Sequence, residues 1–200
     1  MDAIFRSTQH ALHLAYLIMA DPVKEKNGLR IALIRIIESI GTLNKRQASF
    51  LEYLYGEKGS VNFDGLDALE IRGQCAMITA AVKDQLQQAE RYAVWVRYAR
   101  GTERKEGVIW VSKKLRPAVN VNLNAVRYLV AEQSLPKEER DPQKTFRYIS
   151  DQTDVPIRTL ERAAMTIRKQ LAAYQNSAYD KLTPMFERDG LVCPTGEVLV

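Results

Sequence analysis

The stretch FRYISDQTDVPIRTLERAA, residues 146–164, decides the fold of the C-terminal part of the chain. From Leu160 onward, and past the end of this stretch, apolar residues follow at intervals of 4, 3 and 4, which places Leu160, Ala164, Ile167 and Leu171 on one face of a helix. Pro156 suits the first turn of that helix, because its φ is already helical and its missing amide would have no partner there. The pattern predicts two helices joined by a short turn at Asp154. Their predicted shared core consists of Ile149, Val155, Leu160, Ala164, Ile167 and Leu171.

Two positions between these helices are restricted by packing and backbone geometry. Helices that cross steeply need a small residue where they approach, and Ser150 provides it. The turn needs a residue that tolerates left-handed backbone, which Asp154 does better than most. The outward positions are rich in arginine, which pairs with guanine edges, while threonine and lysine hold phosphates. We predict base contacts by Arg158 and Arg162, a base or phosphate contact by Thr159, and backbone contacts by Arg147, Arg168 and Lys169.

The segment resembles the bacterial helix-turn-helix pattern, in which an Ile-Ala pair, a Gly-Val turn and a Thr-Val-x-Arg run follow at fixed spacing. Ile149-Ser150, Asp154-Val155 and the run at 159–162 occupy these positions. The resemblance covers residues 146–164 and implies that residues 145–174 bind double-stranded DNA, as in a regulator of transcription. In its size and in the helical body that precedes the motif, the chain is similar to phage and prophage regulators, among them late-operon antitermination proteins. The run at 159–162 is also similar to the DNA-binding helix of sigma factors, which makes RNA polymerase a candidate partner.

The remainder of the chain also shows helical spacing of apolar residues, and alternation typical of strands is scarce. We therefore expect a mainly α protein, with a helical body followed by a C-terminal three-helix helix-turn-helix unit. Residues 101–107 are expected to form a charged turn, and residues 108–115 suit a helix or a strand equally. The predicted helices before the motif are residues 2–20, 29–40, 44–54, one through Ile71, Cys75, Ile78, Val82 and Leu86, 92–99, and a supporting helix at 124–134.

Three parts of the chain are expected from these patterns. A helical body covers residues 1–118, with a candidate hinge at the glycine-rich residues 56–65. The DNA-binding unit covers residues 119–176, and a C-terminal helix and tail cover residues 177–200. Two prolines and several charges at residues 135–142 mark either a boundary or a loop within one domain. The apolar stripes of the body serve an internal core or a homodimer equally well.

Positive charge is concentrated outside the motif. The formal net charge is +5 with a pI near 9.2, and residues 91–116 carry eight Lys or Arg against two Glu. Tyr and Trp side chains interleave with these charges, so the stretch suits either a second nucleic-acid surface or aromatic core with a solvated charged face. The candidate residues of this second surface are Arg97, Arg100, Arg104, Lys105, Lys113 and Lys114.

Other functions find less support in the residues. We expect a cytoplasmic protein without membrane association, because no signal peptide and no long apolar run is visible. His10 and His13 have no third ligand at a convincing spacing, so neither metal nor cofactor is expected. No nucleophile, metal or paired-carboxylate motif supports an enzyme. The main alternative is a phage DNA-packaging or structural adaptor that uses the same motif to dock DNA.

Overall fold

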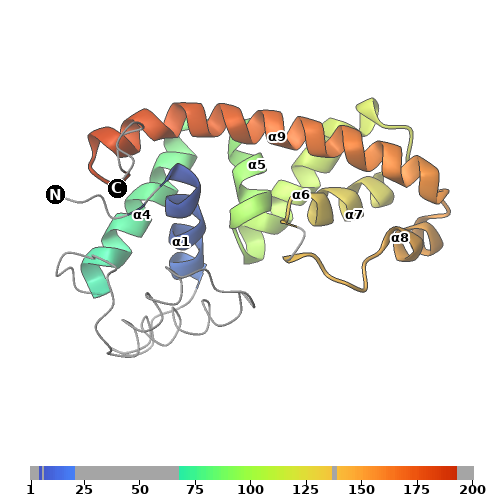
Figure 1. Ribbon diagram of the computed structural model, residues 1–200, viewed down its shortest axis with the longest axis horizontal. Coiled ribbons are helices and arrows are strands. Elements are labelled where there is room, and N and C mark those ends of the chain that lie inside the picture. Colours follow the sequence, from blue (N-terminus) through green and yellow to red (C-terminus); the bar gives the residue numbers. More distant parts are fainter. Residues whose placement is uncertain (1–4, 6, 21–67, 137–138, 193–200) are drawn as a thin grey trace, which may run out of the picture. The chain divides into compact units, whose positions relative to one another are not determined.

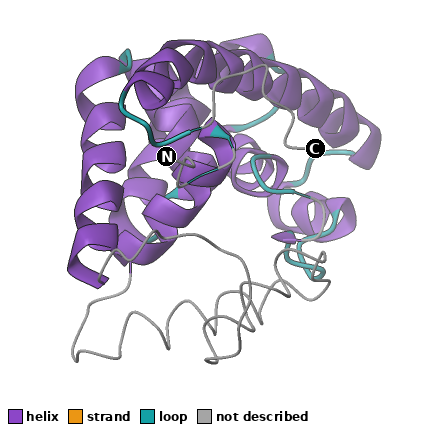
Figure 2. Cartoon of the chain, turned by 60° about the vertical axis from the view of Figure 1, so that its left-hand side comes forward, coloured by secondary structure: helices purple, strands orange, loops and turns teal. Residues whose placement is uncertain are grey.

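The computed structural model describes residues 5, 7–20, 68–136 and 139–192, and these residues are largely helical (Figure 1). Within them no strand forms (Figure 2), although Phe5 and Val192 make an isolated parallel bridge. The expectation of a mainly α protein is therefore confirmed. The predicted helices at 29–40 and 44–54 and the hinge at 56–65 lie outside the described residues. The helices are α1 (Thr8–Ala20), α4 (Ala68–Gln85), α5 (Gln88–Tyr98), α6 (Gly101–Leu115), η1 (Arg116–Ala118), α7 (Leu123–Gln133), α8 (Phe146–Thr153) and α9 (Ile157–Arg188).

Contacts between residues divide the chain into two compact units. Unit 1 comprises residues 1–81 and 182–200, and unit 2 comprises residues 82–181. The predicted boundary between residues 119–176 and 177–200 falls within α9, which runs through position 176 without a break. The helix continues because its buried face does: Leu171, Gln175, Ala178, Leu182 and Phe186 follow at intervals of 4, 3, 4 and 4.

Unit 1 joins the beginning of the chain to its C-terminal part. The amide of Phe5 donates to the carbonyl of Leu191 at 2.8 Å, and the hydroxyls of Thr8 and Thr183 lie 2.6 Å apart. The first helix begins at Thr8, later than predicted from the sequence. In α4 the predicted apolar face is buried, and burial raises the pKa of the Cys75 thiol to about 12. This thiol is therefore a core group.

Unit 2 contains one apolar core built from α5, α6, α7, α8 and α9. Its buried residues include Val96 of α5, Val111 of α6, Leu129 of α7, Ile149 of α8 and Leu160 of α9. In Figure 1, α7 lies between α6 and α8, and both neighbours contact it. Among the described residues, no helix combines the length and apolar composition needed to cross a membrane.

The expected charged turn at residues 101–107 is wrong, because these residues form the first two turns of α6. Gly107 explains why the helix can pass here: a Cβ on it would lie 2.9 Å from Cγ2 of Val96 and 3.1 Å from the carbonyl oxygen of Tyr92. The glycine is thus the point at which α6 approaches α5 closely. Residues 108–115 continue the same helix, so the choice between helix and strand is resolved in favour of helix.

Glu90 connects α5 to α9 from inside unit 2. The side chain is 5% exposed and accepts hydrogen bonds from Ser177 at 2.7 Å, from Lys181 at 2.5 Å and from the amide of Gln87 at 2.9 Å. Burial by itself would raise the pKa of this carboxyl, but the three donors outweigh burial, so the pKa lies below its usual value. Glu90 therefore stabilises unit 2 in its ionised form.

Candidate nucleic-acid interface

The turn between α8 and α9 is the most constrained backbone in this region. Asp154 adopts φ 52° and ψ 30°, the left-handed conformation expected from the sequence, and it is the single non-glycine residue with positive φ in the described part of the chain. Ser150 donates to the carbonyl of Val155 at 2.7 Å, which ties α8 to the chain beyond the turn. At the other end of α8, Thr145 caps the helix by accepting from the amide of Tyr148.

Asn122 holds the turn against α7. Its Oδ1 accepts from the amide of Ala125 at 2.9 Å and caps α7, while its Nδ2 donates to the carbonyl of Thr153 at 2.8 Å. Because Thr153 is the last residue of α8, this one side chain joins the start of α7 to the end of α8. The direction in which α9 leaves the turn thus depends on α7 as well as on α8.

The residues predicted to form the core of this part are all buried. The supporting helix runs over α7, close to the predicted residues 124–134, and it buries Val126, Leu129 and Val130. Opposite it lie the predicted residues of α8, the turn and α9, namely Ile149, Val155, Leu160, Ala164, Ile167 and Leu171. The sequence pattern therefore predicted the burial of these six residues correctly, the last four of them from their spacing.

The predicted contact residues differ in how free they are. The side chains of Arg158 and Arg162 are exposed on the first two turns of α9, and Thr159 between them is half-buried. Arg147 on α8 and Lys169 on α9 are likewise exposed. Arg168 is exposed but already donates to Oε1 of Gln133 on α7 at 2.6 Å, so its guanidinium also fixes α9 to its supporting helix.

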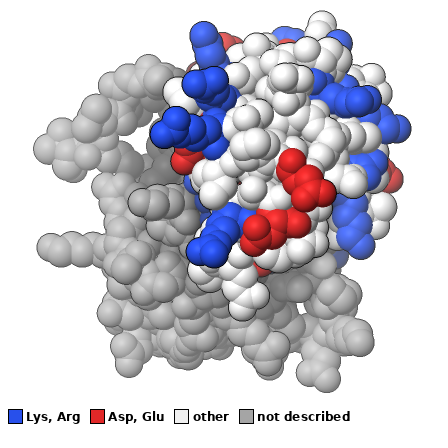
Figure 3. Space-filling model, turned by 90° about the vertical axis from the view of Figure 1, so that its right-hand side faces the viewer, with Lys and Arg blue, Asp and Glu red and all other residues white. Residues whose placement is uncertain are grey.

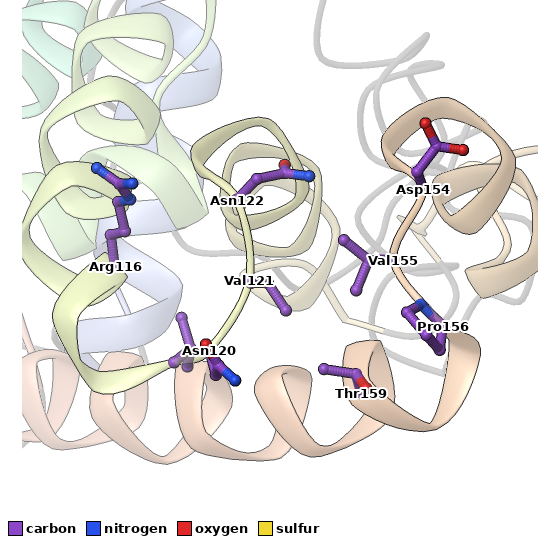
Figure 4. Close-up of a pocket in the computed structure, with 9 residues that line it drawn as sticks. Arg116, Asn120, Val121, Asn122, Asp154, Val155, Pro156 and Thr159 are labelled. Carbon is purple, nitrogen blue, oxygen red and sulfur yellow. The ribbon is translucent and has the colours of Figure 1, made fainter.

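An open hollow of about 580 Å³ lies beside the start of α9 (Figure 4). Arg116 at the end of α6 lines it from one side, and Asp154, Pro156 and Thr159 line it from the other. The linker that leads into α7 forms the part between them, with Asn120 exposed. No pattern in the sequence indicated that Arg116 and Asn120 would meet this turn, because they lie more than thirty residues before it.

Acidic side chains also lie in this region. Asp151 of α8, Asp154 of the turn and Glu161 of α9 are all exposed. Figure 3 looks onto the end of unit 2 that carries α8 and the start of α9, and it shows Lys and Arg gathered along the margins with acidic side chains between them. Positive and negative side chains are therefore both present on this face.

Two residues of the second predicted surface are engaged inside unit 2. Arg97 donates to the carbonyl of Ser134 at 3.1 Å, and Arg104 donates to the carbonyl of Ala131 at 3.0 Å. Both arginines are therefore bonded to the end of α7 and only half-exposed, and their contact with a nucleic acid stays a prediction. The other four residues, Arg100, Lys105, Lys113 and Lys114, are exposed.

The aromatic residues of the same stretch pack on one another. The ring of Tyr92 stacks on Trp110 and meets Trp95 edge to face, with 5.1 Å between ring centroids in each pair. Tyr98 is buried, and its hydroxyl lies 2.8 Å from that of Tyr179. These contacts support the interpretation of this stretch as aromatic core, with Tyr92 and Trp110 partly buried.

Within the described residues, no group of three or more His, Cys, Asp or Glu is arranged to hold a metal ion. His10 lies against the ring of Phe5, with 6.0 Å between centroids. Comparison of the chain with protein-family models and with curated proteins found no match.

Proposed function

We propose that this protein binds double-stranded DNA sequence-specifically through α8, the turn at Asp154 and the start of α9, and that it regulates transcription. The observation that carries the proposal is the combination of a left-handed turn residue with a buried three-helix core and exposed Arg158 and Arg162. In a helix-turn-helix the second helix enters the major groove with its N-terminal residues on base edges. The first two turns of α9 would be that recognition element.

The exposed row at the start of α9 has the chemistry that such reading requires. Arginine pairs bidentately with guanine, and apolar side chains contact the thymine methyl group. Ile157 is 41% exposed and Met165 is 68% exposed, and they border Arg158 and Arg162 on the same helix. Glu161 can accept from a cytosine amine, so the acidic residue is compatible with base reading.

Selection of bound fragments from random duplex DNA, in competition with nonspecific DNA, tests the proposal. We expect a defined sequence to be enriched, and Arg162→Ala to weaken binding to it by about 1–3 kcal/mol while relaxing one base position. The matched control is Arg188→Ala, an exposed arginine 26 residues further along α9 that pairs with Asp189. The affinity of the Arg188→Ala variant for the selected site should equal that of the wild type.

Regulation is tested by a reporter gene whose promoter carries the selected sequence. Expression of the wild-type protein should change transcription, and Arg162→Ala should remove the change. A site with two-fold symmetry would indicate a dimer, since operator symmetry mirrors protein symmetry. Failure to enrich any sequence would disprove sequence-specific binding and would favour a packaging or structural adaptor that holds DNA without reading it.

A further inference from the structure

One face of α6 presents a row of exposed side chains. Lys105, Ile109, Lys113 and Arg116 follow at intervals of 4, 4 and 3, so they lie along one side of the helix and its continuation into η1. We call Lys105, Lys113 and Arg116 the basic row. Within the described residues none of the three makes an ion pair or a side-chain hydrogen bond, whereas nearby Glu103 pairs with Lys83 at 2.8 Å.

The length of the basic row suits a DNA backbone. At about 1.5 Å per residue the row extends over roughly 16 Å, which corresponds to about five base-pair steps of 3.4 Å. The row is positive along its length, although exposed Glu106 borders it. Ile109 interrupts it and is 43% exposed, too small an apolar area by itself for a protein-binding patch.

The basic row ends where the proposed recognition helix begins. Arg116 lines one side of the hollow, and Thr159 of α9 lines the other, with Asn120 on the linker between them (Figure 4). The hollow therefore joins the surface of α6 to the surface of α9 inside unit 2. Arg116 and Thr159 therefore border the same hollow although they belong to different helices.

We propose that the basic row holds the phosphates of the duplex that flanks the sequence read by α9. This inference rests on the proposed function, and it adds a surface that contributes affinity without reading sequence. Lysine and arginine side chains of this kind neutralise phosphates and release counterions, which makes binding steeply salt-dependent. Asp154 lines the far side of the hollow, so the phosphates approach from the side of Arg116.

The salt dependence of binding to the selected duplex tests the basic row. The variant Lys105→Gln/Lys113→Gln/Arg116→Gln should flatten the slope of log K against log salt by about 0.9 for each phosphate that is no longer neutralised, so by two to three in all. The base preference should not change. Extending the selected duplex by about six base pairs on each side should tighten wild-type binding, and the same extension should have no effect on the triple variant.

A pair of neighbouring lysines provides the matched control. Lys113 belongs to the basic row. The exposed Lys114 was a candidate for the second surface from the sequence alone, but it lies about 100° further round the helix and therefore outside the row. Lys113→Gln should flatten the slope, and Lys114→Gln should leave it nearly unchanged. An equal change of slope for both lysine variants would show a general effect of net charge and would overturn the inference. A triple variant with the wild-type slope would also overturn it, and this face of α6 would then be left to a protein partner.

The two proposals fail in different ways. If α9 does not read DNA, no sequence is enriched and Arg162→Ala has no effect, whatever the row does. If only the basic row is wrong, enrichment and the weaker binding of Arg162→Ala remain, and the slope and the length dependence of the triple variant match those of the wild type.

Discussion

The side-chain amide of Asn122 donates to the carbonyl of Thr153 at 2.8 Å, and the residue that follows Thr153 is the left-handed Asp154. The same side chain accepts from the amide of Ala125 at the start of α7. The turn that orients α9 is therefore fixed from outside the two helices it connects. A sequence motif restricted to residues 146–164 does not contain this contact.

Asn122→Asp isolates the contact to the turn. Aspartate caps α7 as well as asparagine does, but it has no donor for the carbonyl of Thr153 and places a carboxylate against it. We expect the free energy of unfolding to fall by about 1–3 kcal/mol. Urea unfolding followed by the fluorescence of Trp95 and Trp110 reports on unit 2. Asn124→Asp, an exposed position two residues away with the same charge change, should stay within about 0.5 kcal/mol of the wild type.

Substitutions at Asp154 test the left-handed backbone directly. Asp154→Gly should stabilise unit 2 by up to about 1 kcal/mol, because glycine adopts positive φ without steric cost. Asp154→Val should destabilise it by about 1–2 kcal/mol, since a β-branched residue is strained there. Asparagine tolerates the same backbone conformation but carries no charge. Asp154→Asn therefore separates the effect of the charge on stability from the effect of the conformation. Equal unfolding free energies for the glycine and valine variants would contradict the left-handed turn.

Two helical glycines predict opposite responses to the same substitution. Gly107→Ala brings a Cβ to 2.9 Å from Val96 and should lower the melting temperature, with a packing cost of about 1–3 kcal/mol. Gly73→Ala in α4 meets nothing within 4 Å and should raise the melting temperature, because alanine favours a helix by about 0.8–1 kcal/mol over glycine. Circular dichroism at rising temperature measures both. A rise for Gly107→Ala would mean that α5 and α6 do not approach closely.

Glu90 predicts a pH dependence of stability. Its pKa is lower in the folded protein than the unfolded value of about 4.3, so the ionised form stabilises the fold above that pH and the stabilisation is lost as pH falls through the folded pKa. Glu90→Gln should cost about 1–2 kcal/mol at pH 7, discounted because Lys181 is 41% exposed. The difference from the wild type should shrink below about pH 4. Glu106→Gln, at an exposed position, is the control and should change the unfolding free energy at pH 7 by less than about 0.5 kcal/mol.

The sequence was most informative where one helix face repeats. The intervals of 4, 3 and 4 from Leu160 predicted the buried side of α9, and the same pattern predicted that of α4. It was wrong at residues 101–107, where charge and glycine suggested a turn. Lys, Arg and Glu are good helix formers, and Gly107 is needed for packing on α5, a long-range contact that local composition cannot reveal.

The candidate site was predicted only in part for the same reason. Exposure of Arg158 and Arg162 follows from the periodicity of α9. The hydrogen bonds of Arg97 and Arg104 could not be predicted from periodicity, because these bonds depend on where α7 ends relative to α5 and α6. Arg116 and Thr159 line one hollow although they lie far apart in the sequence, and no local pattern relates them.

The last turn of α7 accepts hydrogen bonds from several arginines. The carbonyl of Ala131 accepts from Arg104, and the carbonyl of Ser134 accepts from Arg97. The carbonyl of the adjoining Leu135 accepts from Arg140 at 3.1–3.2 Å. The last carbonyls of a helix lack hydrogen-bond donors and carry partial negative charge. A guanidinium group supplies both the donors and a positive charge. Part of the basic excess of this chain therefore neutralises its own backbone, and lysine in place of these arginines would keep the net charge while losing the forked geometry.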